Sequence, residues 1–397
     1  MRHKKILLRI FYAAGFAALN SWAFAARAAP YEVLDLTPPD FSSAEIAGVI
    51  KPPFMYVNPN PADPIRLVGS GEPANGGTAH ALLWTGLNNQ PLDLNPTGFT
   101  WSVILAADGN LQELVGGGAT QDGERPLALL WKQSTNSSGS YKATDLTPKG
   151  FSWAQIYDVS ESMRVGWGVP TDGNQPHALI WNGDDADSVK DLNLQGFIGS
   201  GAYAVGSYDV VGMAIPPGDQ WDSRHAFFWM GLAHKPIDLN PSGFTMSEAD
   251  AIYEPGGKIE PDVAAAGAWE VGTGTPPSSK FSHALLWQQQ NPAAVDLNPA
   301  GFDSSKAVAI TSNEQAGWGN PAGSSNTHAL VWNSTAASCI DLHQFLPIGY
   351  TDSVATCIDS DGDVFGSATD ASGRVHAIEW KYLSPTAGEA SNSVDIK

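Results

Sequence analysis

Histidine and tryptophan recur along this chain at regular places, and histidine can bind metals or move protons. An element of the form His-Ala-apolar-apolar-Trp occurs six times, and a seventh copy carries Leu127 in place of the histidine. The six copies supply the pairs His80/Trp84, His177/Trp181, His225/Trp229, His283/Trp287, His328/Trp332 and His376/Trp380. A metal needs several ligands within about 2 Å of one point, whereas equivalent residues of a repeat lie apart. We therefore expect each histidine to hydrogen-bond a neighbouring strand, and the tryptophans to fill space between repeats.

A second element, Asp-Leu, alternates with the first and is usually followed by Asn-Pro or Thr-Pro and then Gly-Phe. Its copies start at Asp35, Asp93, Asp145, Asp191, Asp238, Asp296 and Asp341. Aspartate side chains accept backbone hydrogen bonds at turns. We expect that structural role for this repeated aspartate.

Two further groups of residues could do chemistry. The segment Asp359-Ser-Asp361-Gly-Asp363 resembles a calcium loop, but its glycine comes earlier than in an EF-hand. We interpret it as a hairpin turn, with calcium as the alternative, and expect no other cofactor. Cys339 and Cys357 could form a disulfide in an exported protein. Their expected places on an outermost and an innermost strand favour free thiols, and both states remain open.

The elements that position these residues follow from the spacing. Successive Asp-Leu pairs lie 45 to 58 residues apart, which is typical of a repeat protein. In the unit from 296 to 332, short strands are expected at 305–310, 316–319 and 327–332, followed by the next Asp-Leu strand. No helical period separates them. The pattern predicts an all-β, seven-bladed β-propeller with four antiparallel strands per blade; an open β-solenoid is the alternative.

The two ends of the repeat region complement each other. The chain begins with an isolated Asp-Leu strand and ends with His376–Trp380, which lacks an Asp-Leu partner. Pairing of 33–36 beside 376–380 would close the ring with N- and C-terminal strands and remove both exposed edges. We therefore predict one domain over residues 30–383, followed by a disordered polar tail over 384–397.

Residues 1–29 read as a signal peptide: a basic start, an apolar run and small-residue cleavage signals such as Ala23-Phe24-Ala25. A membrane anchor is the alternative. The leader holds five of the 21 basic residues and no acidic one, so the mature chain has 16 basic against 41 acidic residues, a charge of about −25. Such a chain repels phosphate backbones, which excludes nucleic-acid binding. We expect a secreted or periplasmic monomer that does not insert in membranes.

These repeats resemble the HAF-repeat family of bacterial extracellular proteins. The resemblance rests on His-Ala-apolar-apolar-Trp, Asp-Leu with Gly-Phe, an inner Ser-x-Ala-x-Ala-Ile strand and a Val-Gly-x-Gly strand, and it covers the whole mature chain. Asp-Leu is followed here mostly by Asn-Pro, where typical members carry Leu-Gly-Thr-Leu-Gly-Gly. The resemblance implies secretion and a propeller-like fold, and it implies no defined activity.

Positions that differ between the repeats are free to contact a ligand. Two such positions flank the small residue near the start of each innermost strand, at one mouth of the expected central channel. The candidates are Glu45, Trp101, Trp153, Gln155, Glu248, Lys306 and Asp352. Aromatic side chains and carboxylates at one opening are typical of a carbohydrate or polar-ligand surface. Solvated loop ends are the alternative, and the long insertions at 51–64 and 254–267 are a second candidate surface.

The leading hypothesis is a secreted, non-enzymatic propeller that binds a polysaccharide or a surface protein through the channel mouth. A glycan hydrolase or lyase is the alternative, with Glu45, Glu248 and Asp352 as candidates, and it needs two carboxyls roughly 5–9.5 Å apart. A purely structural surface protein is the third possibility.

Overall fold

The computed structural model describes residues 31–383, apart from 51–64, 110–112, 122, 124, 135–139, 161–162, 232–234, 256–267 and 289. The predicted signal peptide, the predicted tail, the insertion at 51–64 and most of that at 254–267 lie outside the described residues. Within the described ranges, no helix is long and apolar enough to cross a membrane.

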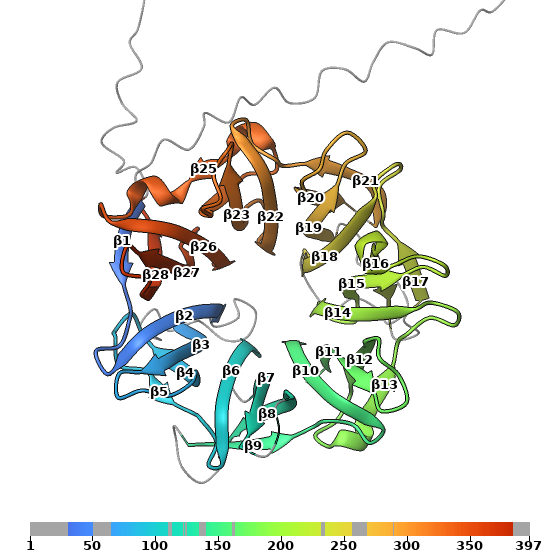
Figure 1. Cartoon of the computed structure of the whole chain (residues 1–397), viewed down its shortest axis with the longest axis horizontal. Coiled ribbons are helices and arrows are strands. Elements are labelled where there is room, and N and C mark those ends of the chain that lie inside the picture. Colours follow the sequence, from blue (N-terminus) through green and yellow to red (C-terminus); the bar gives the residue numbers. More distant parts are fainter. Residues whose placement is uncertain are drawn as a thin grey trace, which may run out of the picture.

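Seven four-stranded antiparallel sheets surround a central axis, as predicted (Figure 1). Blade 1 holds β2 (Phe41–Ile50), β3 (Arg66–Pro73), β4 (His80–Thr85) and β5 (Leu92–Asp93); blade 2 holds β6 (Phe99–Ala107), β7 (Glu113–Thr120), β8 (Leu127–Gln133) and β9 (Tyr141–Asp145). Blade 3 holds β10 (Phe151–Ser160), β11 (Met163–Pro170), β12 (His177–Trp181) and β13 (Val189–Asp191); blade 4 holds β14 (Gly199–Val205), β15 (Val210–Ile215), β16 (His225–Met230) and β17 (Lys235–Asp238).

Blade 5 holds β18 (Met246–Tyr253), β19 (Trp269–Thr275), β20 (His283–Gln288) and β21 (Asn291–Asp296); blade 6 holds β22 (Phe302–Ile310), β23 (Gln315–Pro321), β24 (His328–Trp332) and β25 (Ile340–Asp341). Blade 7 holds β26 (Tyr350–Ile358), β27 (Val364–Asp370), β28 (Val375–Tyr382) and β1 (Tyr31–Asp35). The loops add four short 3-10 helices that the pattern did not predict: η1 (Ala186–Ser188), η2 (Trp221–Ser223), η3 (Ala336–Ser338) and η4 (Leu342–Phe345).

The first and last strands close the ring. β1 pairs antiparallel with β28, with Leu34 opposite Glu379 and Asp35 opposite Ile378. Closure pairs β28 on both sides, and β1 becomes the outermost strand of blade 7. The seven-bladed ring is therefore confirmed, and the open solenoid is wrong.

The repeated Asp and His form one local unit, a pairing that the sequence pattern did not predict. In all seven blades, Oδ1 of the aspartate accepts the backbone N–H of the second following residue at 2.8–3.0 Å. In the six blades that have the histidine, Oδ2 lies 2.7–2.8 Å from its Nδ1. The unit ties the third strand of each blade to the fourth, and we call it the His–Asp clasp.

In each blade a hydroxyl group accepts the backbone N–H of the alanine that follows the repeated histidine, or Leu127 in blade 2. In five blades the hydroxyl belongs to a serine of the next innermost strand, as in Ala81 N to Ser102 Oγ at 3.1 Å. In the other two it belongs to the residue two after the aspartate, as in Ala377 N to Thr37 Oγ1 at 3.0 Å. The innermost strand then carries Ala44 or Ala154 instead of serine. Both arrangements give a hydrogen-bond acceptor to the buried backbone N–H of the repeated alanine.

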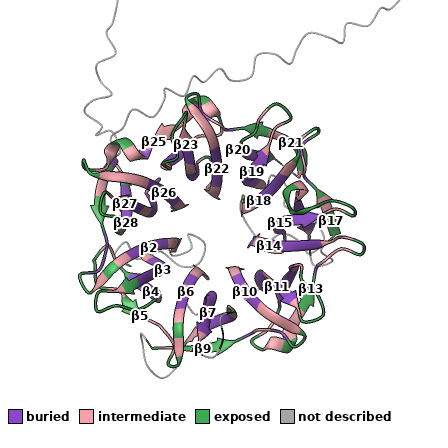
Figure 2. Ribbon diagram, viewed as in Figure 1, coloured by how far each residue is buried: buried purple, intermediate pink, exposed green. Residues whose placement is uncertain are grey.

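The core is divided into seven apolar clusters, each between two neighbouring blades. The inner and middle strands carry most buried residues, while the outer strands are largely exposed (Figure 2). The hydrophobic core therefore forms a ring of interfaces around the channel instead of one central mass.

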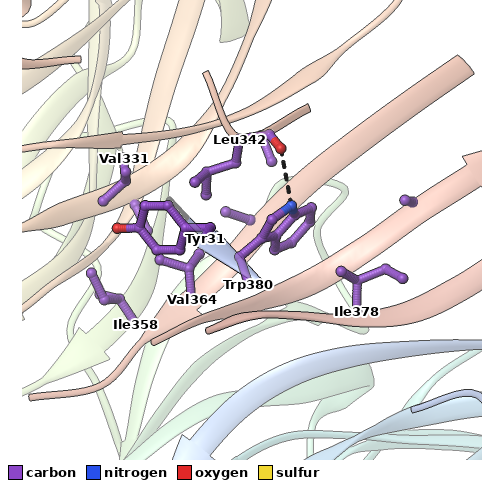
Figure 3. Packing of buried hydrophobic residues seen from close by; sticks show 11 residues of the cluster. Tyr31, Val331, Leu342, Ile358, Val364, Ile378 and Trp380 are labelled. Atoms are coloured by element: carbon purple, nitrogen blue, oxygen red, sulfur yellow. Dashed lines mark hydrogen bonds between the residues drawn. The ribbon is translucent and has the colours of Figure 1, made fainter. Parts of the chain in front are cut away.

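The repeated tryptophans fill these interfaces and are closed to solvent. Five have no exposed surface, and the remaining two, Trp131 and Trp332, are 1 % exposed; the five are Trp84, Trp181, Trp229, Trp287 and Trp380. Five of the seven donate Nε1–H to the leucine carbonyl of the preceding Asp-Leu, as Trp84 does to Leu36, Trp287 to Leu239, and Trp380 to Leu342 at 3.1 Å (Figure 3). Each of the seven apolar clusters between blades contains one of these tryptophans.

The acidic segment near the C-terminus is the turn between β26 and β27. Asp359 Oδ1 accepts the backbone N–H groups of Asp361 and Asp363 at 2.8 and 3.1 Å. In the part of the chain that the structure describes, no group of three or more His, Cys, Asp or Glu could hold a metal ion. Cys339 precedes β25, Cys357 lies on β26, and both are free thiols.

Candidate functional site

The predicted mouth residues lie on the innermost strands that surround the axis (Figure 1). A glycine on the second strand of each blade sets their backbone position. A Cβ on Gly272 would lie 2.0 Å from the carbonyl oxygen of Glu248, and one on Gly317 would lie 2.0 Å from that of Lys306. Only glycine permits so close an approach. The Val-Gly-x-Gly strand therefore supports the site residues directly.

Four charged side chains from blades 4, 5 and 6 form one cluster on the channel wall. Lys306 Nζ lies 2.6 Å from Glu248 Oε1 and 2.9 Å from Asp250 Oδ1. Arg224 Nε donates to Glu248 Oε2 at 2.8 Å. The four side chains are between 10 and 22 % exposed, so they are largely desolvated but still reached by solvent. Two cationic side chains thus contact two carboxyl groups.

The two carboxylates of this cluster differ in protonation behaviour. Burial, with the charge of Glu248 adding to it, raises the pKa of Asp250 to about 7. Burial also acts on Glu248, but the cations Lys306 and Arg224 outweigh it and lower the pKa of that carboxyl. One oxygen of Asp250 is buried without a hydrogen-bond partner among the described residues. At neutral pH the cluster thus holds one ionised and one partly protonated carboxyl.

An aromatic cluster continues the wall over blades 3 and 4. Trp153 contacts Trp167 edge to face with ring centroids 4.7 Å apart. Trp167 stacks on Tyr157 at 6.2 Å, and Tyr157 meets Tyr203 edge to face at 5.9 Å. The nearby charges of Glu248 and Asp250 add to burial in raising the pKa of Tyr203. The aromatic and charged clusters therefore form one surface from Trp153 to Lys306.

The structure brings some of the predicted mouth residues together and separates the others. Glu248 and Lys306 are in contact, and Trp153 and Gln155 lie beside Tyr157 and Trp167. Glu45 on blade 1 instead accepts the Ser70 hydroxyl at 3.0 Å.

The remaining two predicted residues stand apart from this surface. On blade 7, Asp352 accepts the Thr327 backbone N–H at 2.9 Å. Trp101 lies opposite Ala119 in blade 2. The three carboxylates considered for catalysis, on blades 1, 5 and 7, thus have separate partners.

The repeated tryptophans and histidines hold the blades in place and do not line the channel wall. Side chains without exposed surface, such as those of Trp84, Trp229 and Trp287, cannot touch a ligand in the channel, although indole rings often do so in sugar-binding sites. The histidines of the clasps lie on the third strand of each blade, two strands away from the channel wall. Both sets therefore act by holding the blades, and the innermost strands carry the candidate ligand contacts.

Sequence reasoning missed Asp250, Tyr157, Tyr203, Trp167 and Arg224. The first three share one position, three residues after the small residue of the innermost strand, where the other blades carry Ala, Leu, Val and Thr. Comparing the repeats at that position as well would have found them. Arg224 directly precedes a repeated histidine, where no other unit has a charge.

Comparisons with known proteins find distant structural similarity only. No protein-family model and no curated protein matches the chain. Among solved structures it is similar to TolB from Acinetobacter baumannii, at 13 % identity and a TM-score of 0.32, covering 87 % of this chain and 65 % of that one. It is also similar to a prolyl endopeptidase, at 8 % identity and a TM-score of 0.47, covering 87 % and 51 %. The chain thus spans less than two thirds of the length of either.

Proposed function

We propose that this protein is an exported binding module that holds a polysaccharide on the channel wall of blades 3 to 6. The observation that carries the proposal is the continuous surface from the aromatic cluster to the charged cluster. Flat rings stack on sugar faces, and paired acids and bases hydrogen-bond hydroxyl groups. The repeat's resemblance to the HAF-repeat family and the leader-like residues 1–29 support export.

The internal charge balance points to the class of glycan. Arg224 and Lys306 already neutralise the carboxylates of this cluster, so the wall offers hydrogen-bond donors and acceptors with little net charge. The pKa values of Tyr157 and Tyr203 are raised mainly by burial, so both hydroxyls stay protonated and able to donate at neutral pH. A neutral polysaccharide fits such a surface better than a polyanion does.

The test is a glycan array with the full chain and two matched variants. Trp153→Ala removes the outer ring of the aromatic cluster, whereas Trp101→Ala removes the equivalent residue of the neighbouring blade, which stands outside it. We expect Trp153→Ala to weaken binding about tenfold, which corresponds to the loss of roughly 1.4 kcal/mol, and Trp101→Ala to leave it within about twofold. Equal effects, or no bound glycan, would contradict the proposal.

Glycan hydrolysis is the second candidate, because of the pair Glu248 and Asp250. Both carboxyl groups bind the same Lys306 Nζ, at 2.6 Å for Glu248 and 2.9 Å for Asp250. The separation of the two bound oxygens therefore cannot exceed the sum of these two distances. Retaining glycosidases place their carboxyls about 5–5.5 Å apart, and pKa values pushed in opposite directions suit an acid and a nucleophile. Lys306 occupies both groups, which favours binding. Release of reducing ends from an array-positive glycan, lost in Asp250→Asn, would instead establish hydrolysis.

A further inference from the structure

Loops that join the second strand of a blade to the third lie on the mouth side of the ring, because the second strand ends opposite the start of the innermost one, as Thr275 does opposite Met246. In blades 4 and 5 these loops span residues 216–224 and 276–282, and each carries one exposed aromatic side chain. Trp221 is 42 % exposed and Phe281 is 49 % exposed. The loops of the other five blades contain no aromatic residue. Two neighbouring loops thus differ from the repeat in a way that suits a ligand contact.

The loop of blade 4 holds its aromatic ring in a fixed place. Trp221 begins η2, and Arg224 follows that short helix. Arg224 Nη1 donates to the Trp221 carbonyl at 3.1 Å, and its guanidinium carbon lies 5.7 Å from the centroid of the indole ring, a cation–π contact. In the loop of blade 5, the backbone N–H and carbonyl of Phe281 instead bond the Ser279 hydroxyl. A ring that is already held loses less entropy when a ligand stacks on it.

Arg224 also connects Trp221 to the charged cluster of the channel wall. Its Nε donates to Glu248 Oε2 at 2.8 Å, and its carbonyl accepts the backbone N–H of Ser247, near the start of β18, at 2.8 Å. Glu248 in turn binds Lys306. One side chain therefore contacts both the indole ring at the mouth and a carboxyl group on the wall, and the channel-wall surface continues out of the mouth as far as Trp221.

The surroundings of Trp221 favour a neutral ligand. The positive charge of Arg224 is already paired with Glu248. The same loop adds Asp219 and Asp222, which are exposed and would repel a polyanion. An indole ring, by contrast, offers a large apolar face to a sugar ring. The loop thus fits the same class of ligand as the channel wall.

We propose that Trp221 forms an outer subsite for the same neutral polysaccharide, whose chain runs from the channel wall past Arg224 to the indole ring at the rim of the mouth. This inference rests on the proposed function and extends it. A short oligosaccharide occupies only the wall, whereas a longer one also stacks on Trp221. Affinity therefore rises again once the oligosaccharide is long enough to reach the rim.

The test measures the affinity of an array-positive glycan, as a series of oligosaccharides of increasing length, for the full chain by titration calorimetry. Trp221→Ala should weaken the longest oligosaccharides about tenfold, the effect of one stacked ring, and leave the shortest within about twofold. Trp221→Tyr, which keeps a ring, should recover most of the loss. Phe281→Ala removes a ring of similar exposure from the next loop and should change no affinity by more than about twofold.

Quenching of tryptophan fluorescence by acrylamide reports on the contact itself. Among the tryptophans in the described ranges, Trp221 alone is exposed, while the seven repeated ones are at most 1 % exposed. The longest oligosaccharide should reduce the share of quenching that Trp221→Phe abolishes, and the shortest should leave that share unchanged.

The outcomes separate this inference from the proposed function. If Trp153→Ala weakens every oligosaccharide and Trp221→Ala weakens none, the wall site stands and the outer subsite is wrong. Equal losses in Trp221→Ala at all lengths, or equal losses in Trp221→Ala and Phe281→Ala, would also overturn the outer subsite. If no oligosaccharide binds to the wild type, both proposals are wrong.

Discussion

Glu270 is a carboxyl in a position that four other blades fill with leucine or valine, and its titration should control stability near neutral pH. It stands two residues before Gly272, equivalent to Leu67, Leu114 and Val210 in other blades. The residue is 0 % exposed, and neither carboxyl oxygen meets full hydrogen-bond geometry with a described residue, although Gln290 lies close enough to favour the ionised form slightly. Burial, with the charge of Asp209 adding to it, raises the pKa of Glu270 from 4.5 to about 8.

The sign of the effect follows from proton linkage. Because the folded state holds the proton more tightly than the unfolded state, stability is highest below pH 4.5 and falls as the pH rises towards 8. Each pKa unit is worth about 1.36 kcal/mol, so Glu270 should cost of order 3.5 kcal/mol between pH 5 and pH 8. For a domain of roughly 350 residues this corresponds to about 5 °C in melting temperature.

Glu270→Gln removes the titration and keeps the shape of the side chain. We measure the melting temperatures of variant and wild type by scanning calorimetry at pH 5 and at pH 8. The melting temperature of the variant minus that of the wild type should be about 5 °C larger at pH 8 than at pH 5. The change with pH is the decisive quantity, because the buried amide adds a constant cost of its own. Glu270→Leu should show the same trend, and Glu72→Gln, at an exposed carboxylate, should show none. A difference that stays constant over this range in both Glu270 variants would refute the reasoning.

Two further predictions concern buried polar pairs. Thr37→Ala leaves the buried N–H of Ala377 without an acceptor and should lower the free energy of unfolding by about 1–3 kcal/mol. The double variant Thr37→Asn/Ala44→Ser introduces the asparagine and serine that other blades carry at these positions, such as Asn95 and Ser102. It should recover most of the lost free energy of unfolding, measured by urea titration. Arg164→Met leaves the buried Glu113 without its guanidinium partner and should cost about 3 kcal/mol. Arg164→Met/Glu113→Gln should be more stable than the single variant, and the opposite order would contradict this account.

The features that could be predicted from the sequence are those that each repeat defines locally. In five blades the His–Asp clasp joins adjacent strands of one hairpin, thirteen or fourteen residues apart, so its two members recur at a nearly constant spacing. The interblade tryptophans recur for the same reason, and ring closure followed from the complementary first and last strands. Strand starts were less predictable: β22 begins three residues before the expected 305 because Phe302 already pairs with Pro321.

The candidate site was only partly predictable, because its members meet across blades. Glu248 and Lys306 were chosen for differing between repeats, but nothing in the sequence indicated that Asp250 would share the same ammonium group. Nor did the pattern show that Glu45 would turn to Ser70 instead.

The sequence by itself determined the ring, its seven blades and the place where it closes, because backbone pairing and apolar periodicity are encoded within each short repeat. Only the tertiary structure decided which side chains of different blades touch, such as Lys306 with Glu248 and Asp250, or Tyr31 with Phe345. Such contacts depend on the distance between whole blades, and a difference of a few residues in one crossing segment changes them without changing the repeat.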